Sequence, residues 1–155
     1  MGYSLQFHRT ENGEPADADR EAVSKFLAAR GLRQTPSVKG ALVHLVDRDG
    51  ARLSLDGRSS SGLYVNPLKS VKPLSGGLER PNGTAEELRF IYDLCSAAGW
   101  WVFHPLLGGE KGPQILVPNR NHTKTEMDLL LDRSQMASVF VDSPEELEAG
   151  LHGNE

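Results

Sequence analysis

Residues 84–104 constrain the fold most, because they predict one capped helix that leads directly into an aromatic strand. Thr84 and Glu87 have the spacing of a capping box, in which each side chain satisfies a free backbone N–H at the start of a helix. Apolar residues then recur every three or four positions, which predicts one buried helical stripe. The members of this stripe are Leu88, Ile91, Leu94, Cys95 and Ala98. Gly99 can take the left-handed conformation that ends a helix, and residues 100–103 are aromatic or β-branched, which favours a strand.

The first half of the chain shows several short strand patterns and one helix pattern. The expected strands are residues 3–9, 41–46, 51–55 and 62–65, and the expected helix begins at Asp17 or Asp19 and ends near Arg30. Asp49-Gly50 between two apolar runs is a strong hairpin signal, and the three strands 41–65 predict a meander. Residues 66–83 are rich in proline and glycine, which predicts a long irregular loop.

The second half adds a hairpin, a further strand and a closing helix. Residues 114–117 are expected to pair with the aromatic strand, and residues 138–142 form a last strand. Residues 126–131 fit either a short helix or an apolar patch. Residues 143–146, with Ser143 as the cap, Pro144 at the first helical position and Glu146 at the third, open a short helix that ends near Gly150. The whole pattern predicts an α+β fold, with a mostly antiparallel sheet of about six to seven short strands, two main helices on one face and a short C-terminal helix.

Length and cysteine content limit the class of protein. The 155 residues fit a single domain spanning 1–155, in which residues 152–155 are a loose tail. No apolar run approaches the roughly 20 residues that span a membrane, and the opening residues lack a signal-peptide pattern. Cys95 is the single cysteine, which suits a reducing, cytoplasmic compartment. Its apolar setting predicts a small buried side chain, whereas a catalytic thiolate needs a helix N-terminus or a cationic neighbour.

Charge is unevenly distributed along the chain, whose net charge is −4. Residues 11–21 and 142–155 each hold five acidic residues, whereas residues 30–80 hold nine basic and four acidic ones. The basic residues are scattered singly and lack interleaved aromatics, so the sequence predicts no nucleic-acid partner. A charge run usually coats a solvated face, and an acidic end also suits a basic partner.

Signatures of catalysis, metal binding and cofactor binding are missing from the sequence. The histidines have no zinc-binding spacing, and the glycines of residues 108–112 do not form a phosphate-binding loop. A zinc or acid–base site built from His104, His122 and Glu126 is the one alternative that the spacing leaves open. We therefore expect no catalytic residue, no metal and no cofactor.

Two features are candidates for recognition of a partner. Residues 119–124 form a strongly polar run, which fits an ordinary exposed loop or a recognition loop containing Arg120 and His122. Trp100 and Trp101 are expected to point to opposite faces of a strand. Core packing of both tryptophans is one interpretation, and a binding hot spot at one of them is the other.

Three stretches carry a resemblance to a known class of proteins: YSLQFHR at the start, ELRFIYDLCSAAGWWVF in the helix–strand core, and the acidic ending VDSPEELEAGL. The chain resembles small cytoplasmic immunity proteins of bacterial polymorphic-toxin and contact-dependent inhibition systems. The resemblance implies that the chain neutralises one cognate toxin by tight binding, often by covering its active site. It carries no residue roles, because such proteins share no common binding signature.

The sequence leaves three classes open: a protein-binding module, an enzyme with a site built from loops, and a small-molecule sensor. We predict the first, a non-enzymatic binder of one cognate protein such as a basic toxin domain, with no membrane partner. The predicted contact residues are Asp142, Glu145, Glu146, Glu148, Arg120, His122 and Trp101. The alternative is a small enzyme or small-molecule-binding protein with its site near His104 and His122.

Overall fold

The fold centres on a seven-stranded sheet in the order β11-β10-β9-β1-β8-β7, with β2 paired to β1. The computed structural model describes residues 4–11, 14–35, 43–55, 58–59, 62–79, 84–104, 114–118, 137–141 and 143–152. The strands of this sheet are β1 (Ser4–Glu11), β2 (Glu14–Ala16), β7 (Leu63–Val65), β8 (Gly76–Glu79), β9 (Trp101–His104), β10 (Gln114–Pro118) and β11 (Ala137–Val141). Neighbouring strands are antiparallel, except that β10 and β11 are parallel.

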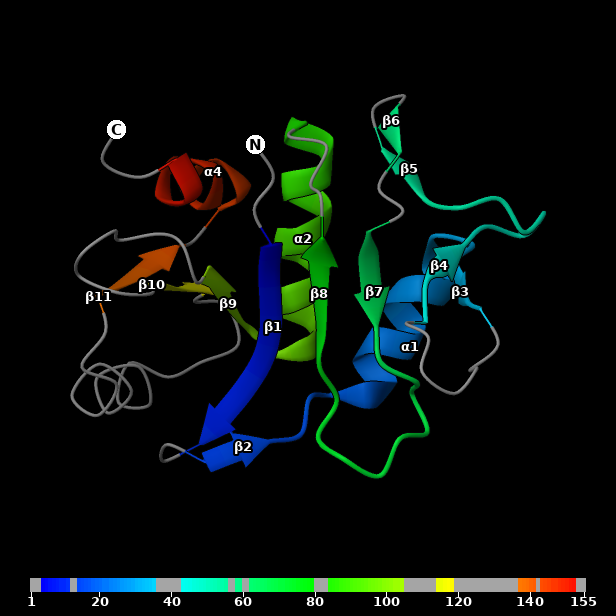
Figure 1. The fold of residues 1–155 in the computed structure, drawn as a ribbon, viewed down its shortest axis with the longest axis horizontal. Coiled ribbons are helices and arrows are strands. Elements are labelled where there is room, and N and C mark those ends of the chain that lie inside the picture. Colours follow the sequence, from blue (N-terminus) through cyan, green and yellow to red (C-terminus); the bar gives the residue numbers. More distant parts are fainter. Residues whose placement is uncertain are drawn as a thin grey trace.

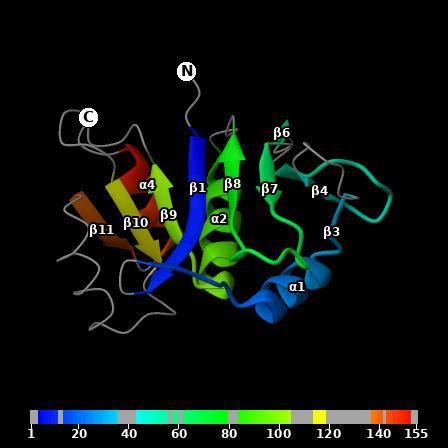
Figure 2. The same cartoon turned by 60° about the horizontal axis from the view of Figure 1, so that its bottom comes forward.

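The helices of the described residues lie behind the sheet in the view of Figure 1, and the turned view in Figure 2 shows them on the same side. They are α1 (Arg20–Ala29), α2 (Ala85–Ala98) and α4 (Pro144–His152). The middle helix, α2, contacts both α1 and α4. The α+β class and the two main helices with a short C-terminal helix are thereby confirmed. Within the described ranges, no helix is long and apolar enough to cross a membrane.

Two smaller strand pairs flank the sheet. One joins β3 (Arg33–Gln34) to β4 (Leu45–Val46), and the other joins β5 (Ser54–Leu55) to β6 (Arg58–Ser59). In Figure 1 both lie on the β7 side of the molecule. The last helix extends to His152, beyond the expected end near Gly150, so the predicted loose tail does not begin at residue 152. Residues 126–131 and 153–155 lie outside the described residues.

The predicted cap, stop and apolar face of α2 are confirmed. The Thr84 side chain accepts a hydrogen bond from the backbone N–H of Glu87 at 3.2 Å. Gly99 has φ 77°, and its N–H donates to the carbonyl of Cys95. All five predicted stripe residues are buried. Burial also raises the pKa of the Cys95 thiol well above its usual range, because an apolar setting disfavours the thiolate.

Trp100 connects three parts of the core. Its ring is fully buried and stacks on Phe7 of β1, with ring centroids 6.0 Å apart. Its indole N–H donates to the carbonyl of Leu74 at 2.9 Å, so the polar end of the ring is satisfied inside the core. The helix–strand unit and the segment before β8 are thus joined through one side chain.

The prediction of an irregular loop over residues 66–83 is wrong for Gly76–Glu79, which form β8 between β1 and β7. A Cβ atom on Gly76 would lie 2.6 Å from the Tyr64 carbonyl oxygen. On Gly77 it would lie 2.7 Å from the Leu5 carbonyl oxygen. The two glycines therefore allow β8 to pass close to both neighbouring strands. They also give this strand the glycine-rich composition that is typical of a loop.

The hairpin at Asp49-Gly50 is confirmed, but the order of the predicted meander is wrong. Gly50 has φ 82°, and the two arms meet in a bridge between Val46 and Arg52. The strand expected at 62–65 does not follow the second arm. It pairs with β8 and meets the first arm in a bridge between His44 and Tyr64. This strand belongs to the main sheet because all three of its residues pair with residues of β8.

Candidate functional site

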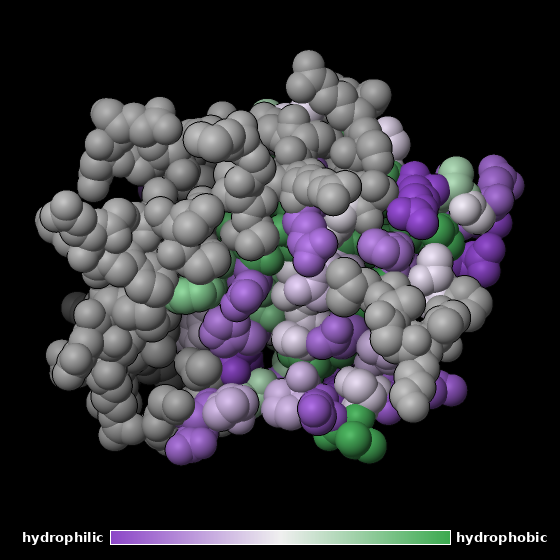
Figure 3. All heavy atoms as spheres, viewed as in Figure 1, coloured by the Kyte–Doolittle hydropathy of each residue, from purple (hydrophilic) through white to green (hydrophobic). Residues whose placement is uncertain are grey.

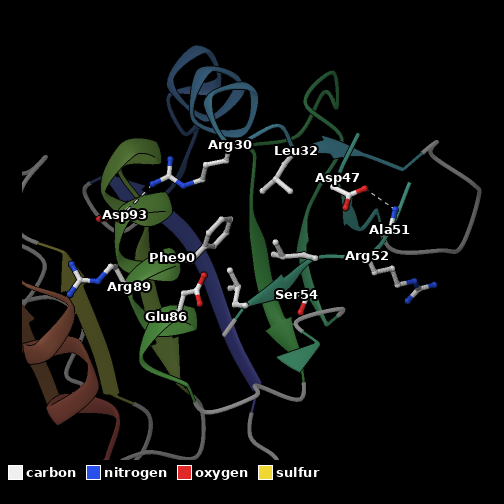
Figure 4. Close-up of a pocket in the computed structure, with 12 residues that line it drawn as sticks. Arg30, Leu32, Asp47, Ala51, Arg52, Ser54, Glu86, Arg89, Phe90 and Asp93 are labelled. Atoms are coloured by element: carbon white, nitrogen blue, oxygen red, sulfur yellow. Dashed lines mark hydrogen bonds and ion pairs between the residues drawn. The ribbon is translucent and has the colours of Figure 1, made fainter. Parts of the chain in front are cut away.

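A cleft of about 520 Å³ lies between the first half of α2 and the hairpin of residues 45–55 (Figure 4). Its floor is apolar and comes from Leu32, Leu53, Leu55 and Phe90. Its rim carries three arginines and three carboxylates, which are Arg30, Arg52, Arg89, Asp47, Glu86 and Asp93. In Figure 4, Phe90 and Glu86 project from α2 toward the hairpin. A smaller hollow of about 450 Å³ continues from the rim at Arg30 and Asp47.

The hairpin wall of the cleft is shaped by Asp47. Its Oδ1 atom accepts hydrogen bonds from the backbone N–H groups of Asp49 at 2.8 Å and Ala51 at 3.0 Å. An aspartate that binds backbone N–H groups a few residues ahead fixes a tight turn. Because Gly50 supplies the positive φ that this turn needs, Ala51 and Arg52 are held at the cleft wall.

The end of the cleft next to α1 is closed by two aromatic rings and a guanidinium. Phe90 meets Phe26 of α1 edge-to-face, with centroids 5.3 Å apart. The Arg30 guanidinium lies 3.7 Å from the Phe26 ring centroid and forms an ion pair with Asp93 at 3.7 Å. The planar guanidinium can make both contacts, because its face lies over a ring while its edge lies near a carboxylate. The two helices are thereby joined at the cleft.

The charges of the rim are only partly paired. Arg30 pairs with Asp93, Asp47 accepts backbone hydrogen bonds, and Arg89 pairs with Glu145 of α4. In the part of the chain that the structure describes, the side chains of Arg52 and Glu86 have no hydrogen-bond or ion-pair partner, and both residues are exposed. The cleft therefore offers one free cation on the hairpin side and one free carboxylate on the α2 side.

The acidic start of α4 continues the rim. Arg89 binds Glu145 with N–O distance 3.1 Å, and the two side chains are 62% and 70% exposed. In Figure 4, Arg89 points from the cleft toward α4. Glu146 follows in the first turn of α4, where its N–H donates to the Ser143 hydroxyl at 3.1 Å. Rim and helix start together carry three arginines and five carboxylates.

The predicted contact residues differ in whether the structure describes them and in whether they are exposed. Glu145 and Glu146 are exposed, and Glu145 pairs with Arg89 at the rim of the cleft. The prediction that Trp101 is a contact residue is wrong, because its side chain is only 2% exposed in a strand that pairs with both β1 and β10. Asp142, Arg120 and His122 lie outside the described residues, and the side chain of Glu148 is not described.

The alternative site of His104, His122 and Glu126 stays a prediction. His122 and Glu126 lie outside the described residues, and only the backbone of His104 is described, at the end of β9. Among the side chains that the structure does describe, no three of His, Cys, Asp and Glu gather as metal ligands would. His8 on β1 has its pKa lowered by burial, which disfavours the imidazolium.

The cleft was not identified from the sequence, although part of its signal was visible there. The polar residues Glu86, Arg89 and Asp93 recur at intervals of three and four and therefore share one side of α2. That spacing is also typical of a solvated helix face. The contact with the hairpin, more than 30 residues earlier in the chain, turns this polar side into the wall of a cleft.

Comparisons with known proteins provide no relative from which a site could be transferred. No protein-family model, curated protein or solved structure matches the chain. The resemblance to immunity proteins therefore stays a prediction. The geometry and charge of the cleft are the observations from which a function can be proposed.

Proposed function

We propose that this chain is a protein-binding module that neutralises a cognate bacterial toxin by tight binding. The observation that carries the proposal is the cleft, in which an apolar floor is surrounded by exposed charged side chains. Protein interfaces have this anatomy: a water-excluding apolar centre takes an anchor side chain, and a polar rim encloses it. The toxin as partner comes from the resemblance of the sequence.

The exposure of the rim favours a protein over a small ligand. Half of the cleft-lining residues are exposed, including Ala51, Arg52 and Ser54 along the hairpin. A small-molecule site typically buries about 70–90% of its ligand. An open cleft of this kind leaves much of a small ligand in water, whereas a side chain of a larger partner is covered by the partner itself.

The balance of charge around the cleft favours a basic partner. Among the described residues, the rim and the start of α4 carry five carboxylates against three arginines, which is an excess of two negative charges. An acidic surface raises the association rate of a basic partner and disfavours acidic competitors. Glu145, which pairs with Arg89, and its neighbour Glu146 are exposed charges at the start of α4.

A small-molecule ligand is the second candidate. The volume of about 520 Å³ lies within the range of roughly 300–1,000 Å³ typical of ligand sites. A ligand of this kind would raise the melting temperature of the purified protein in a saturable way, and Ala51→Trp would abolish the rise. If a protein partner is found and no small molecule raises the melting temperature, the protein-binding module remains as the proposed function.

A pull-down from the native host's extract, at low and moderate salt, tests the proposal. The baits are the wild type, Glu145→Lys/Glu146→Lys, and a control Glu14→Lys/Glu21→Lys, which makes the same charge change on exposed residues away from the cleft. We expect one stoichiometric partner on the wild type and the control, and its loss from the α4 variant at moderate salt.

The second half of the experiment asks what the captured protein does. Expression of the partner alone should arrest bacterial growth, and co-expression with this chain should restore it. A partner that is harmless when expressed alone would contradict toxin neutralisation. The absence of any stoichiometric partner, with a clean monomer on a sizing column, would contradict protein binding itself.

A further inference from the structure

We infer that the loop of residues 66–75, between β7 and β8, is a second docking surface that inserts Val71 into an apolar, acid-rimmed pocket of a partner protein. Val71 is 99% exposed, and among the described residues it is the single large apolar side chain with an exposed surface. In Figure 3 an apolar area projects at the lower edge of the molecule, over the loop that joins β7 to β8 in Figure 1.

The charges beside Val71 define the chemistry of the partner. Lys69 and Lys72 flank the tip and are exposed, and neither ammonium has a partner among the residues that the structure describes. The tip therefore presents one branched aliphatic group between two free cations. A complementary surface has an apolar pocket for the valine and carboxylates at its rim.

A guanidinium from α1 fixes the tip from behind. Arg20 donates from Nη1 to the carbonyls of Leu68 at 2.9 Å and Ser70 at 2.6 Å, and from Nη2 to the carbonyl of Lys72 at 2.6 Å. These three carbonyls lie on both sides of Val71 in the chain. One side chain thus holds the backbone that carries the exposed valine.

Asp17 and Trp100 fix the second half of the loop. The Asp17 carboxylate accepts from Arg20 at 2.8 Å and from the backbone N–H of Leu74 at 2.9 Å. Leu74 is fully buried, and its carbonyl accepts the indole N–H of Trp100. The chain is therefore anchored in the core three residues after the tip.

The first half of the loop is held by Gln34 of β3. Its amide nitrogen donates to the carbonyls of Val65 and Asn66, both at 2.9 Å, and its amide oxygen accepts from the N–H of Leu68 at 3.2 Å. The Asn66 side chain donates across the loop to the Ser75 hydroxyl at 2.7 Å. The loop is closed at its base and clamped near its tip.

A lone exposed valine is common on protein surfaces and by itself indicates nothing. What distinguishes Val71 is that side chains from three other segments order the loop around it, while its own side chain contributes nothing to the core. A preordered tip loses little conformational freedom on binding, which is the general advantage of preorganisation. The apolar group is presented to the outside on a rigid support.

A protein fits this tip better than a membrane does. Recognition of an anionic bilayer usually needs about four to eight clustered basic residues or a broad apolar helix face. The loop offers two lysines and one valine. A small apolar group with two flanking cations instead matches a pocket of limited size. The loop contributes no residue to the cleft, so this inference stands apart from the proposed function.

Photo-crosslinking in the native host tests the inference directly. The full chain carries Val71→p-benzoylphenylalanine, and a control carries Ala28→p-benzoylphenylalanine at an exposed position on α1. We expect a light-dependent adduct with one protein at position 71 and none at position 28. Lys69→Glu/Lys72→Glu in the same chain should lower the adduct about tenfold, whereas Lys25→Glu/Arg33→Glu, the same charge change elsewhere, should not.

The remaining outcomes overturn the inference. No adduct, or an equal adduct at position 28, excludes docking through the tip. A lipid adduct identifies a membrane contact, and an adduct of twice the chain mass identifies self-association. A partner crosslinked at a site without acidic neighbours contradicts the assigned chemistry.

Discussion

Replacement of Arg20 measures how much of the structure depends on one side chain. The guanidinium is bound to three loop carbonyls at 2.6–2.9 Å and to the Asp17 carboxylate at 2.8 Å. Arg20→Met keeps much of the aliphatic stem and removes every one of these bonds. We expect the loop to lose its fixed position and the protein to lose stability, while the core on the other side of α1 is retained.

The magnitude follows from the number of bonds and their exposure. A net hydrogen bond contributes about 0.5–1.5 kcal/mol. The Arg20 side chain is 27% exposed, so the freed carbonyls can partly rehydrate, and the lower half of that range applies. Three bonds then give about 1.5–3 kcal/mol, and the half-exposed pair with Asp17 adds roughly 0.5 kcal/mol. Arg20→Met should therefore lower the free energy of unfolding by about 2–3.5 kcal/mol.

Arg20→Lys separates charge from geometry. Lysine keeps the positive charge but cannot present a planar fork to three carbonyls, so we expect an intermediate loss of about 1–1.5 kcal/mol. Lys25→Met is the control, because Lys25 pairs with Glu21 on α1 and both side chains are more than 70% exposed. Its loss should stay below roughly 0.5 kcal/mol.

Urea-induced unfolding followed by circular dichroism gives these free energies, and amide hydrogen exchange locates the change. The amides of Ser70 and Leu74, which are hydrogen-bonded in the loop, should exchange faster in Arg20→Met. A loss for Arg20→Met no larger than that of Lys25→Met, with unchanged exchange in the loop, would refute the clamp.

Three further outcomes are expected. Burial lowers the folded-state pKa of His8 below its usual 6.5, so the unfolded state binds the proton more readily and the free energy of unfolding should fall as the pH drops below about 6.5. His8→Gln should remove this pH dependence. Parallel curves of unfolding free energy against pH for the wild type and His8→Gln would contradict the assignment. Thr84→Ala should cost about 1 kcal/mol in thermal or urea unfolding, because a backbone N–H of the first turn of α2 loses its acceptor; an unchanged midpoint would speak against the cap. Gly62→Ala places a Cβ 1.7 Å from the Glu79 carbonyl oxygen and should lower the free energy of unfolding by about 3 kcal/mol or more. Gly50→Ala should lower it by about 1 kcal/mol, because its positive φ strains an alanine but its surroundings are open. Similar losses of stability at both sites would contradict the close approach of Gly62 to the end of β8.

The elements that the sequence predicted correctly are those determined by local interactions. The cap at Thr84, the stop at Gly99 and the turn at Asp49-Gly50 each depend on residues within a few positions of one another. Their sequence signals are therefore complete in themselves. The apolar spacing of α2 likewise predicts which side is buried, since any packing partner must lie on that side.

The elements that were missed depend on contacts between distant segments. Gly76 and Gly77 have loop-like composition, and their need for a close approach becomes visible only beside Leu5 and Tyr64. Alternation predicted opposite faces for Trp100 and Trp101, but it could not say that both would be buried. Residues from α2 form a cleft because a hairpin from an earlier segment lies against them, and no spacing within α2 encodes that contact.

The most direct test of the central claim is the affinity of the captured partner for a chain whose cleft is blocked. Ala51 is exposed at the cleft wall, and its backbone N–H, not its side chain, holds the hairpin, so Ala51→Trp fills the cleft without a change in charge. Ala28→Trp adds the same bulk to an exposed position of α1 outside the cleft. Isothermal titration calorimetry should show binding at least about tenfold weaker for Ala51→Trp and unchanged for Ala28→Trp. Equal affinities for the wild type and both variants would show that the partner binds elsewhere.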